Sequence, residues 1–424
     1  MSSEKFPDSL EVGIRAHDMH HGLIRRSGGL FNVHMTKTKI VGSAAQLCTV
    51  IKDAEVIENY HQLEASAGEL GMDDLLLEKS LEELEQVEFV RLKRAGGKIT
   101  RVDVTVPLLG DIYRALGARW ADLGPTEIEK ASIQLLDTVS VLPTKTRDIQ
   151  NSLGLDPTQL EIIRTIGINA GYLGEYKSRS DGEMVLYSPL HWEEHPRNIE
   201  QITKKFSASE IVKALRIVRK YPGLPAEEVS NSVLNDAVKS GLLPTPSVVS
   251  TRGKKQFLFT PIGGMKAFEK SIVEKARAII ACVRYGEVYG TITKVRDPLV
   301  LLMALKDRKY LNPHTEALRQ YETLRNLGVG RIERDRKTGR YSLHLIDNDD
   351  NIRALELAIQ LLQTGEPTIQ TEGLQAAKQL LLPGSYLNPT ATRSRFANVE
   401  PAVLPTRMVE YVNDVIRGAN VDFD

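Results

Sequence analysis

Hydrophobic residues recur along the chain with two alternating spacings, and the alternation repeats about four times. Stretches in which apolar residues return every three or four positions, such as 128–141 and 272–284, predict amphipathic helices. Shorter stretches in which apolar and polar residues alternate, such as 99–106 and 341–346, predict strands. In each repeat the helical stretches come first, and two strands joined by a basic, glycine-containing turn follow. This recurrent order predicts one supersecondary unit that is used several times.

We divide the chain into four such modules and two flanking segments. The expected boundaries are 1–42 for a basic N-terminal arm, 43–122, 123–200, 201–266 and 267–365 for modules 1 to 4, and 366–424 for a C-terminal linker with helices. The third helix of module 2 is expected over 157–169, where Asp156 suits its N-cap, and that of module 4 over 313–326. Pro, Thr and Asn are frequent over 383–405, which is typical of an extended linker.

Composition limits the class of protein without identifying a partner. The 424 residues include 55 Lys and Arg against 55 Asp and Glu, so the net charge favours no partner. The two cysteines, Cys48 and Cys282, lie far apart in apolar helical contexts, which indicates free buried thiols and a reducing compartment. The polar N-terminus and the lack of a long apolar run predict a cytoplasmic protein, nucleoid-associated if it binds DNA, with no membrane partner.

Several helices followed by a β-hairpin is the order of a winged helix-turn-helix domain, and over residues 43–363 the chain resembles that superfamily. The resemblance is carried by the helix pairs of the four modules and by their basic turns at 93–98, 177–182, 252–255 and 335–340. No signature residue defines the motif, so it identifies no narrower family. The resemblance implies a mainly α fold with short β-hairpins (α+β), built from tandem winged-helix domains. Each third helix would suit the major groove of DNA, and each hairpin the backbone or minor groove.

The modules differ in how well their local charge suits contact with DNA. Phosphates attract Lys and Arg, whereas base edges bind Arg, Asn, Gln, Ser and Thr. Residues 325–340 hold six basic residues against two acidic ones, although a solvated helix face beside a solvated turn is the alternative. The arm could follow a groove or pack on a neighbouring module. The expected DNA contacts are Arg319, Gln320, Thr323, Arg325, Arg331, Arg334, Arg336, Lys337 and Arg340 in module 4, Arg252, Lys254 and Lys255 in module 3, Arg164, Lys177 and Arg179 in module 2, Lys93, Arg94 and Lys98 in module 1, and Arg25 and Arg26 in the arm.

The third helix of module 1 has the opposite character. Residues 51–88 contain twelve acidic and two basic residues, and this excess of negative charge would repel phosphates. We therefore expect this helix to face a protein partner or solvent. The residues expected at a protein interface are Glu78, Glu82, Glu83 and Glu85.

Catalytic and metal motifs are weak throughout the sequence. His17 and His21 have helical i,i+4 spacing, but no HExxH glutamate lies between them and no third ligand is evident. Glu175 and Lys177 have the E-x-K spacing of some metal-dependent nucleases without the acidic residue those sites need on an adjacent strand. Neither a GxxxxGK[ST] phosphate loop nor a GxSxG elbow occurs. We expect no catalytic residue, no metal and no cofactor, and hence not an enzyme.

Two functions stay open on the sequence. The first is a multi-winged-helix protein that binds double-stranded DNA, as a regulator, a replication initiator or the DNA-recognition subunit of a genome-maintenance or defence complex. The alternative is a winged-helix scaffold or adaptor without direct DNA contact, which the acidic helix and the zero net charge favour. A homo-oligomer is compatible with the sequence, although no heptad repeat supports it.

Overall fold

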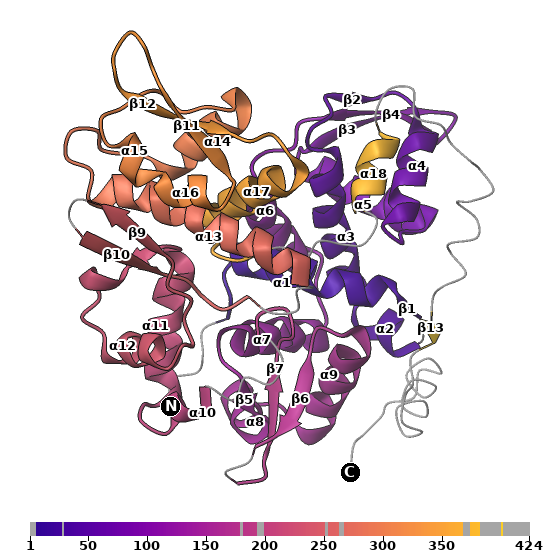
Figure 1. Ribbon diagram of the computed structural model, residues 1–424. Coiled ribbons are helices and arrows are strands. Elements are labelled where there is room, and N and C mark those ends of the chain that lie inside the picture. Colours follow the sequence, from indigo (N-terminus) through magenta and orange to yellow (C-terminus); the bar gives the residue numbers. More distant parts are fainter. Residues whose placement is uncertain are drawn as a thin grey trace. The chain divides into compact units, whose positions relative to one another are not determined.

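The computed structural model describes residues 6–27, 29–178, 181–192, 199–250, 253–262, 267–367, 374–381 and 400–401. In this part the chain is mainly helical with small sheets, antiparallel except for one two-residue parallel pair, which confirms the expected α+β class (Figure 1). The chain divides into two compact units, Met1–Leu190 with Thr368–Asp424, and His191–Pro367. Each unit has its own hydrophobic core.

The first unit is built from helices around two hairpins. Its elements are α1 (Ser9–Ile24), β1 (Arg26–Ser27), α2 (Gly29–His34), α3 (Thr36–Ile51), β2 (Val56–Ile57), α4 (Tyr60–Glu69), α5 (Asp74–Gln86), β3 (Val90–Ala95), β4 (Lys98–Val104), α6 (Leu109–Asp122), α7 (Glu127–Val141), β5 (Thr144–Lys145), α8 (Thr146–Leu153), α9 (Pro157–Ala170), β6 (Gly174–Lys177), β7 (Met184–Tyr187), α18 (Leu374–Leu380) and β13 (Glu400–Pro401). The expected linker 383–405 lies outside the described residues except for β13.

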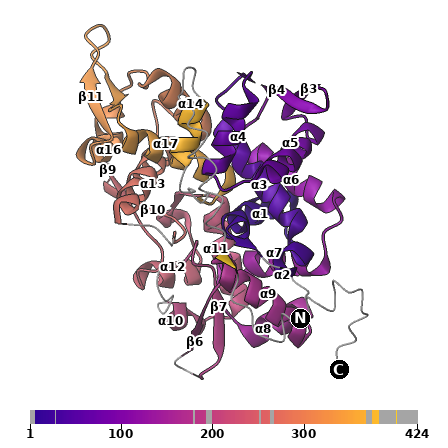
Figure 2. The ribbon, with the colours of Figure 1, turned by 90° about the vertical axis from the view of Figure 1, so that its right-hand side faces the viewer.

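Helix α1 is the centre of this unit, with α3, α6 and α7 around it (Figure 2). It begins at a capping box, in which Glu11 N donates to Asp8 Oδ1 at 3.0 Å and Asp8 N donates to Glu11 Oε2 at 2.9 Å. Gly13 lets α6 approach closely, because a Cβ at this position would lie 2.1 Å from the backbone oxygen of Tyr113. Over Ser9–Ile24 the expected basic arm is therefore helical and mostly buried, which agrees with the alternative of an arm that packs on its neighbours and not with one that follows a groove.

The second unit repeats this plan. Its elements are α10 (Ile199–Thr203), α11 (Ala208–Lys220), β8 (Leu224–Pro225), the 3-10 helix η1 (Ala226–Glu228), α12 (Ser232–Lys239), β9 (Ser247–Ser250), β10 (Gly253–Leu258), α13 (Ala267–Val288), α14 (Pro298–Arg308), α15 (Ala317–Gln320), α16 (Glu322–Asn326), β11 (Gly330–Arg334), β12 (Tyr341–Leu345) and α17 (Asp349–Thr364). Its core joins α13, α14 and α17 to both hairpins.

Four segments of the chain share one order of elements and one strand pairing. A helix leads into a short strand, one or two further helices follow, and a hairpin ends the segment. The short strand pairs with the second strand of the hairpin, which gives the sheet orders β2-β4-β3, β5-β7-β6 and β8-β10-β9. In the fourth segment the single bridges Tyr310–His344 and His314–Tyr341 take the place of the short strand. Two of these segments fall in each compact unit, where neighbours pack together.

The third helices of modules 1 and 2 form as expected, as α5 and α9, but that of module 4 differs. The helix begins at Ala317 and is divided into α15 and α16 around Tyr321. The residues before Ala317 pair with β12 instead of forming a helix. Leu311 N donates to Leu343 O, and His314 N donates to Tyr341 O, both at 2.9 Å. The expectation of one helix over 313–326 is therefore wrong at its start and in its middle.

Candidate nucleic-acid interface

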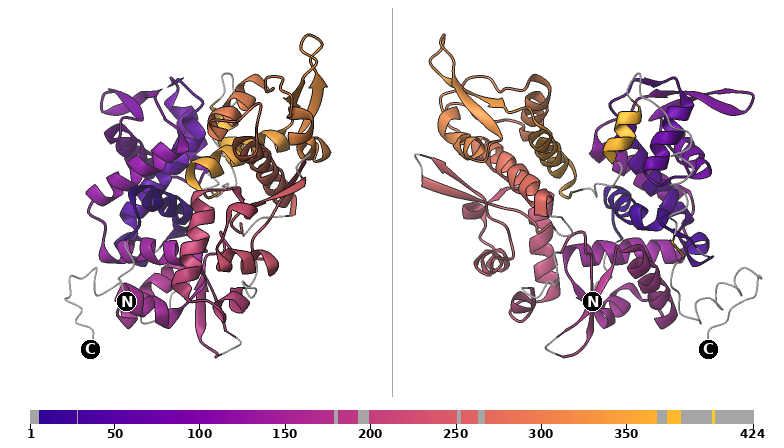
Figure 3. Two further views of the ribbon diagram at one scale, coloured as in Figure 1. Left: turned by 90° about the vertical axis from the view of Figure 1, so that its left-hand side faces the viewer. Right: turned by 45° about the vertical axis from the view of Figure 1, so that its right-hand side comes forward.

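The hairpin β11–β12 is a regular antiparallel ladder that ends in a well-fixed turn. Arg331 pairs with His344 and Arg334 with Tyr341 across the two strands. In the turn, Asp335 accepts hydrogen bonds from Lys337 N at 3.0 Å and from the Thr338 hydroxyl at 2.7 Å. The hydrogen bond from Thr338 lowers the pKa of Asp335. The carboxylate of Asp335 therefore stabilises the turn. The hairpin, in orange in Figure 3, extends beyond the helices of its unit.

The basic residues of this hairpin face solvent without a carboxylate partner. The exposed cations are Arg331, Arg334, Arg336, Lys337 and Arg340. None of them forms an ion pair with a described residue, and Arg334 Nε has only a long contact of 3.4 Å to Gly339 O. The nearby carboxylate of Glu333 lies 3.7 Å from His344 Nε2 instead. The hairpin therefore presents five cations that form no ion pair within 4.0 Å in the described part of the chain, against the two carboxylates of Glu333 and Asp335.

The polar residues of α15 and α16, which precede this hairpin, differ in how far they are available to bind DNA. Arg319 is exposed and has no carboxylate partner among the described residues, whereas Arg325 pairs with Glu322 at 2.9 Å. Thr323 is half-buried. Gln320 is only 1% exposed, and its Nε2 donates to the backbone oxygen of Cys282 at 2.9 Å. The expectation that Gln320 contacts DNA is therefore wrong, because its side chain is part of the core.

In module 1, most of the hairpin cations are held by acidic neighbours. Arg94 lies 3.2 Å from Glu85, and Lys93 lies 3.5 Å from Asp103. Lys98 is exposed and has no ion pair with a described residue. This hairpin consequently offers less free positive charge than β11–β12.

Module 2 also uses its basic residues internally. Arg164 on α9 forms an ion pair with Glu175 on β6, in which Nε lies 2.5 Å from Oε2. Lys177 is exposed and has no carboxylate partner in the described part of the chain, and Arg179 lies outside the described residues. Arg26 of the expected arm is half-buried and donates to Asn169 O at 2.9 Å, while Arg25 is exposed.

The hairpin of module 3 has two described lysines, of which one forms an ion pair and the other does not. Lys255 lies 2.5 Å from Glu227, and its ammonium sits 5.0 Å from the centre of the Tyr289 ring. Lys254 is exposed without an ion pair to a described residue, whereas Arg252 lies outside the described residues. Module 3 therefore adds a single free cation on its hairpin, within the described range.

The carboxylates of the acidic helix α5 are of two kinds: some bind other groups of the protein, and others form no ion pair with a described residue. Glu83 lies 2.6 Å from Arg119, and Glu85 accepts a hydrogen bond from Leu92 N at 2.8 Å. Glu78 and Glu82 are exposed and have no ion pair with a described residue. Leu75, on the same helix, is 62% exposed. The helix thus presents an apolar side chain together with unpaired negative charge.

The histidine-rich stretch of α1 is a buried hydrogen-bonded network. His17 Nε2 donates to Gln46 Oε1 at 2.9 Å, so Nδ1 accepts from the Tyr113 hydroxyl at 2.7 Å. Burial lowers the pKa of His17 to about 4, which keeps the ring neutral. Both ring nitrogens are occupied, so His17 serves to join α1 to α3 and α6.

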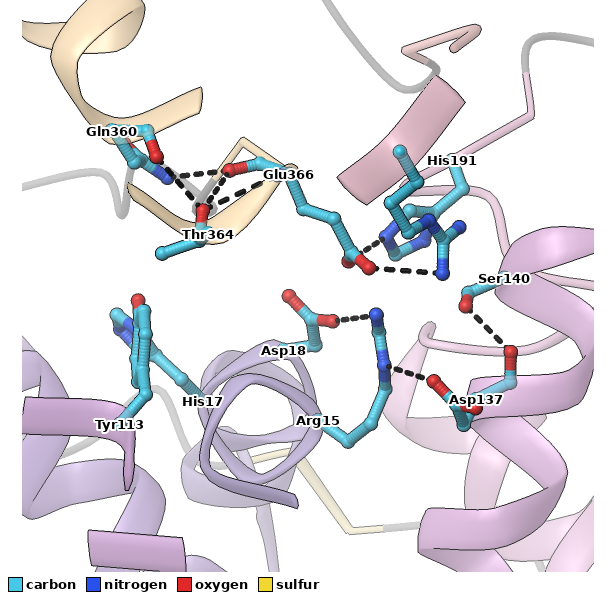
Figure 4. A network of polar contacts seen from close by, with 11 residues as sticks. Arg15, His17, Asp18, Tyr113, Asp137, Ser140, His191, Gln360, Thr364 and Glu366 are labelled. Atoms are coloured by element: carbon cyan, nitrogen blue, oxygen red, sulfur yellow. Dashed lines mark hydrogen bonds and ion pairs between the residues drawn. The ribbon is translucent and has the colours of Figure 1, made fainter. Parts of the chain in front are cut away.

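Charged groups are also paired inside each unit (Figure 4). In the first unit, Arg15 is fully buried and lies 2.6 Å from Asp18 and 3.3 Å from Asp137. In the second, Glu366 lies 3.0 Å from His191 and 2.9 Å from Arg219. Buried charges are stable only when such partners are present. These pairs therefore hold distant parts of the sequence together within their own unit.

Comparisons with known protein families, with curated proteins and with solved structures find no match. Among the described helices, none combines the length and the apolar character that crossing a bilayer requires. The surface chemistry of the modules is therefore what indicates a function, above all the contrast between the paired cations of modules 1 and 2 and the unpaired cations of β11–β12.

Proposed function

We propose that the chain is a DNA-binding protein built from tandem winged-helix modules, with the hairpin β11–β12 as its main contact with the phosphate backbone. The observation that carries the proposal is the set of five exposed hairpin cations that lack a carboxylate partner among the described residues. An unpaired arginine or lysine can bind a phosphate without first losing an internal ion pair. Arginine is especially suited to this because its planar guanidinium can donate two parallel hydrogen bonds to phosphate.

The repeated order of elements supports the same proposal. Helix, short strand, helices and hairpin, with the short strand next to the second hairpin strand, is the arrangement that a winged-helix module requires. Several modules on one chain raise affinity through effective concentration, even when each of them binds weakly. Lys98, Lys177 and Lys254 then provide secondary backbone contacts from the other three hairpins.

Binding of labelled duplex DNA to the full chain, followed by fluorescence anisotropy over a series of salt concentrations, tests the proposal. Each phosphate neutralised by the protein contributes about −0.9 to the slope of log Kobs against log salt. We expect affinity to fall steeply with salt. Absence of binding to any duplex at low salt would remove the proposal.

A second candidate function rests on α5. Its exposed Leu75 lies on the same helix as the unpaired carboxylates of Glu78 and Glu82, which favours a partner protein with a basic, partly apolar surface. Reversal of both charges, Glu78→Lys and Glu82→Lys, should abolish capture of such a partner while DNA binding persists. Retention of the partner by this variant would exclude α5 as the docking surface.

A further inference from the structure

The second unit contains a pocket next to α14 whose residues are distinct from those proposed to bind DNA. The pocket has a volume of about 450 Å³ and lies between α14, the segment 293–297 that precedes it, and residues 310–314. Pockets that bind small molecules usually measure roughly 300–1,000 Å³, so the volume is adequate for a small ligand.

Apolar side chains of α14 and of the segments beside it line part of the pocket. Helix α14 buries Leu302 and Leu305 in the core of its unit and leaves Val300, which is 61% exposed, on the side that lines the pocket. Leu301, Ala304 and Leu311 add further apolar surface. An apolar ligand body placed there would be removed from water, which is worth roughly 25 cal/mol per Å² of apolar surface.

The polar residues of the pocket have an excess of positive charge. Lys294, Arg296 and Arg308 all line it, and none has an ion pair with a described residue. The carboxylate that lines the pocket belongs to Asp297, which is already engaged as the N-cap of α14 and accepts from Leu299 N at 2.9 Å and from Val300 N at 3.1 Å. The unpaired cations therefore favour an anionic group on the ligand.

A second observation points to an unfilled polar contact. His314 also lines the pocket, and its Nδ1 is buried without a hydrogen-bond partner among the described residues. A buried polar atom without a partner costs free energy, so it usually has one in the functional state. Because Nδ1 has almost no accessible surface, it marks an unsatisfied polar group beside the pocket and not a contact that the ligand makes.

We propose that this pocket binds a small amphipathic carboxylate, with its apolar body against Val300, Leu301 and Ala304 and its carboxylate against Arg296 and Arg308. Guanidinium groups bind carboxylates with two parallel hydrogen bonds. Lys294, Arg296 and Arg308 outnumber the carboxylate of Asp297 in the lining, so the local charge attracts an anionic head group. This proposal is independent of DNA binding.

Isothermal titration calorimetry of the full chain with octanoate and with 1-octanol tests the proposal. Octanoate should bind, and 1-octanol, which has the same apolar body without the charge, should bind at least about tenfold more weakly because it cannot form charge-assisted hydrogen bonds. No heat of binding with octanoate at millimolar concentration would overturn the proposal, and so would equal affinity for the two probes.

Three variants locate the site. Arg296→Ala with Arg308→Ala should weaken octanoate binding about tenfold, because the charge-assisted hydrogen bonds are lost. Arg319→Ala with Arg325→Ala, which removes two exposed arginines of the same unit outside the pocket, is the matched control and should leave binding unchanged. Ala304→Phe should block the pocket, and a thermal melt checks that this variant is folded. Unchanged binding in the double arginine variant would overturn the proposal even if Ala304→Phe fails to fold.

Discussion

Arg164 and Glu175 are joined by a two-point ion pair, with Nε 2.5 Å from Oε2 and Nη2 3.1 Å from Oε1. The pair connects α9 to β6, and the hydrogen bonds that Arg164 donates to the Glu175 carboxylate raise the pKa of Arg164. The sequence suggests that α9 contacts a DNA groove. In the structure, however, its Arg164 binds the hairpin of its own module. On β11–β12, by contrast, Arg336 has no such carboxylate partner among the described residues.

The first prediction concerns this ion pair. Arg164→Ala should lower the free energy of unfolding by about 1 kcal/mol or less, because the pair is partly exposed and screened by solvent. The affinity for DNA should change little, since the cation is already occupied. Urea unfolding and anisotropy on the same variant measure the two effects. A large loss of DNA affinity with unchanged stability would show that Arg164 contacts DNA instead.

The second prediction concerns pH and the buried histidine network of α1. Burial lowers the pKa of His17 from 6.5 to about 4, and it also lowers the pKa of His20. Between pH 6.5 and about pH 4, His17 binds a proton in the unfolded chain but not in the folded chain. The contribution of His17 to the free energy of unfolding is therefore fully present above pH 6.5 and is lost as the pH falls toward 4. Each histidine should contribute about 1.4 kcal/mol per pH unit within this window.

Urea unfolding at several pH values in this window measures the slope. In His17→Gln the slope should be smaller than in the wild type by the contribution of one proton, because the acidic residues that also titrate are the same in both chains. An identical slope in the two proteins would show that His17 is not a buried neutral group.

The third prediction concerns the close contact between α1 and α6. A Cβ at Gly13 would lie 2.1 Å from the backbone oxygen of Tyr113, so Gly13→Ala forces the helices apart and should cost about 1–3 kcal/mol or more. Gly96→Ala is the comparison, because a Cβ there meets nothing within 4 Å, although its φ of 57° adds strain of about 1 kcal/mol. Equal thermal shifts in the two variants would contradict this packing.

Residues with long, regular periodicity were the most predictable part of the fold. The helices α5, α7 and α9 and the four hairpins follow from hydrophobic spacing and from capping residues such as Asp156. The short strands β2, β5 and β8 have two residues each, so no alternation can reveal them. They become visible only through pairing with a distant hairpin strand.

The wrong expectations came from contacts that are remote in sequence. Arg15 is one of the basic residues of 1–42, but in the structure it is buried and forms a hydrogen bond with Asp137, which lies 122 positions away. Gln320 has a side chain suited to bases, but it is fixed by the backbone of Cys282. The unpaired cations on β11–β12 were predictable because they depend on a local excess of charge in an exposed turn. The α14 pocket was missed because hydrophobic periodicity does not show how the continuous stretch 293–314 folds back on itself, and this stretch provides every lining residue except Tyr321.

The fourth prediction tests the DNA-binding account most directly, through two variants of equal charge. Arg336→Ala/Lys337→Ala/Arg340→Ala removes three unpaired cations from the hairpin. Lys79→Ala/Arg114→Ala/Lys130→Ala removes three cations from α5, α6 and α7, of which Lys79 and Arg114 are exposed and Lys130 is half-buried. Arg114 and Lys130 have acidic neighbours. Both variants change the net charge by the same amount, so a difference between them reflects position.

The decisive measurement is the salt dependence of duplex binding by the wild type and these two variants, followed by anisotropy on folded, full-length protein. The hairpin variant should lose at least about tenfold in affinity, and the magnitude of its salt slope should fall by about three. The control variant should stay within about threefold of the wild type, since its cations are not expected to reach phosphate. Equal losses in the two variants, or a hairpin variant that binds like the wild type, would contradict the account.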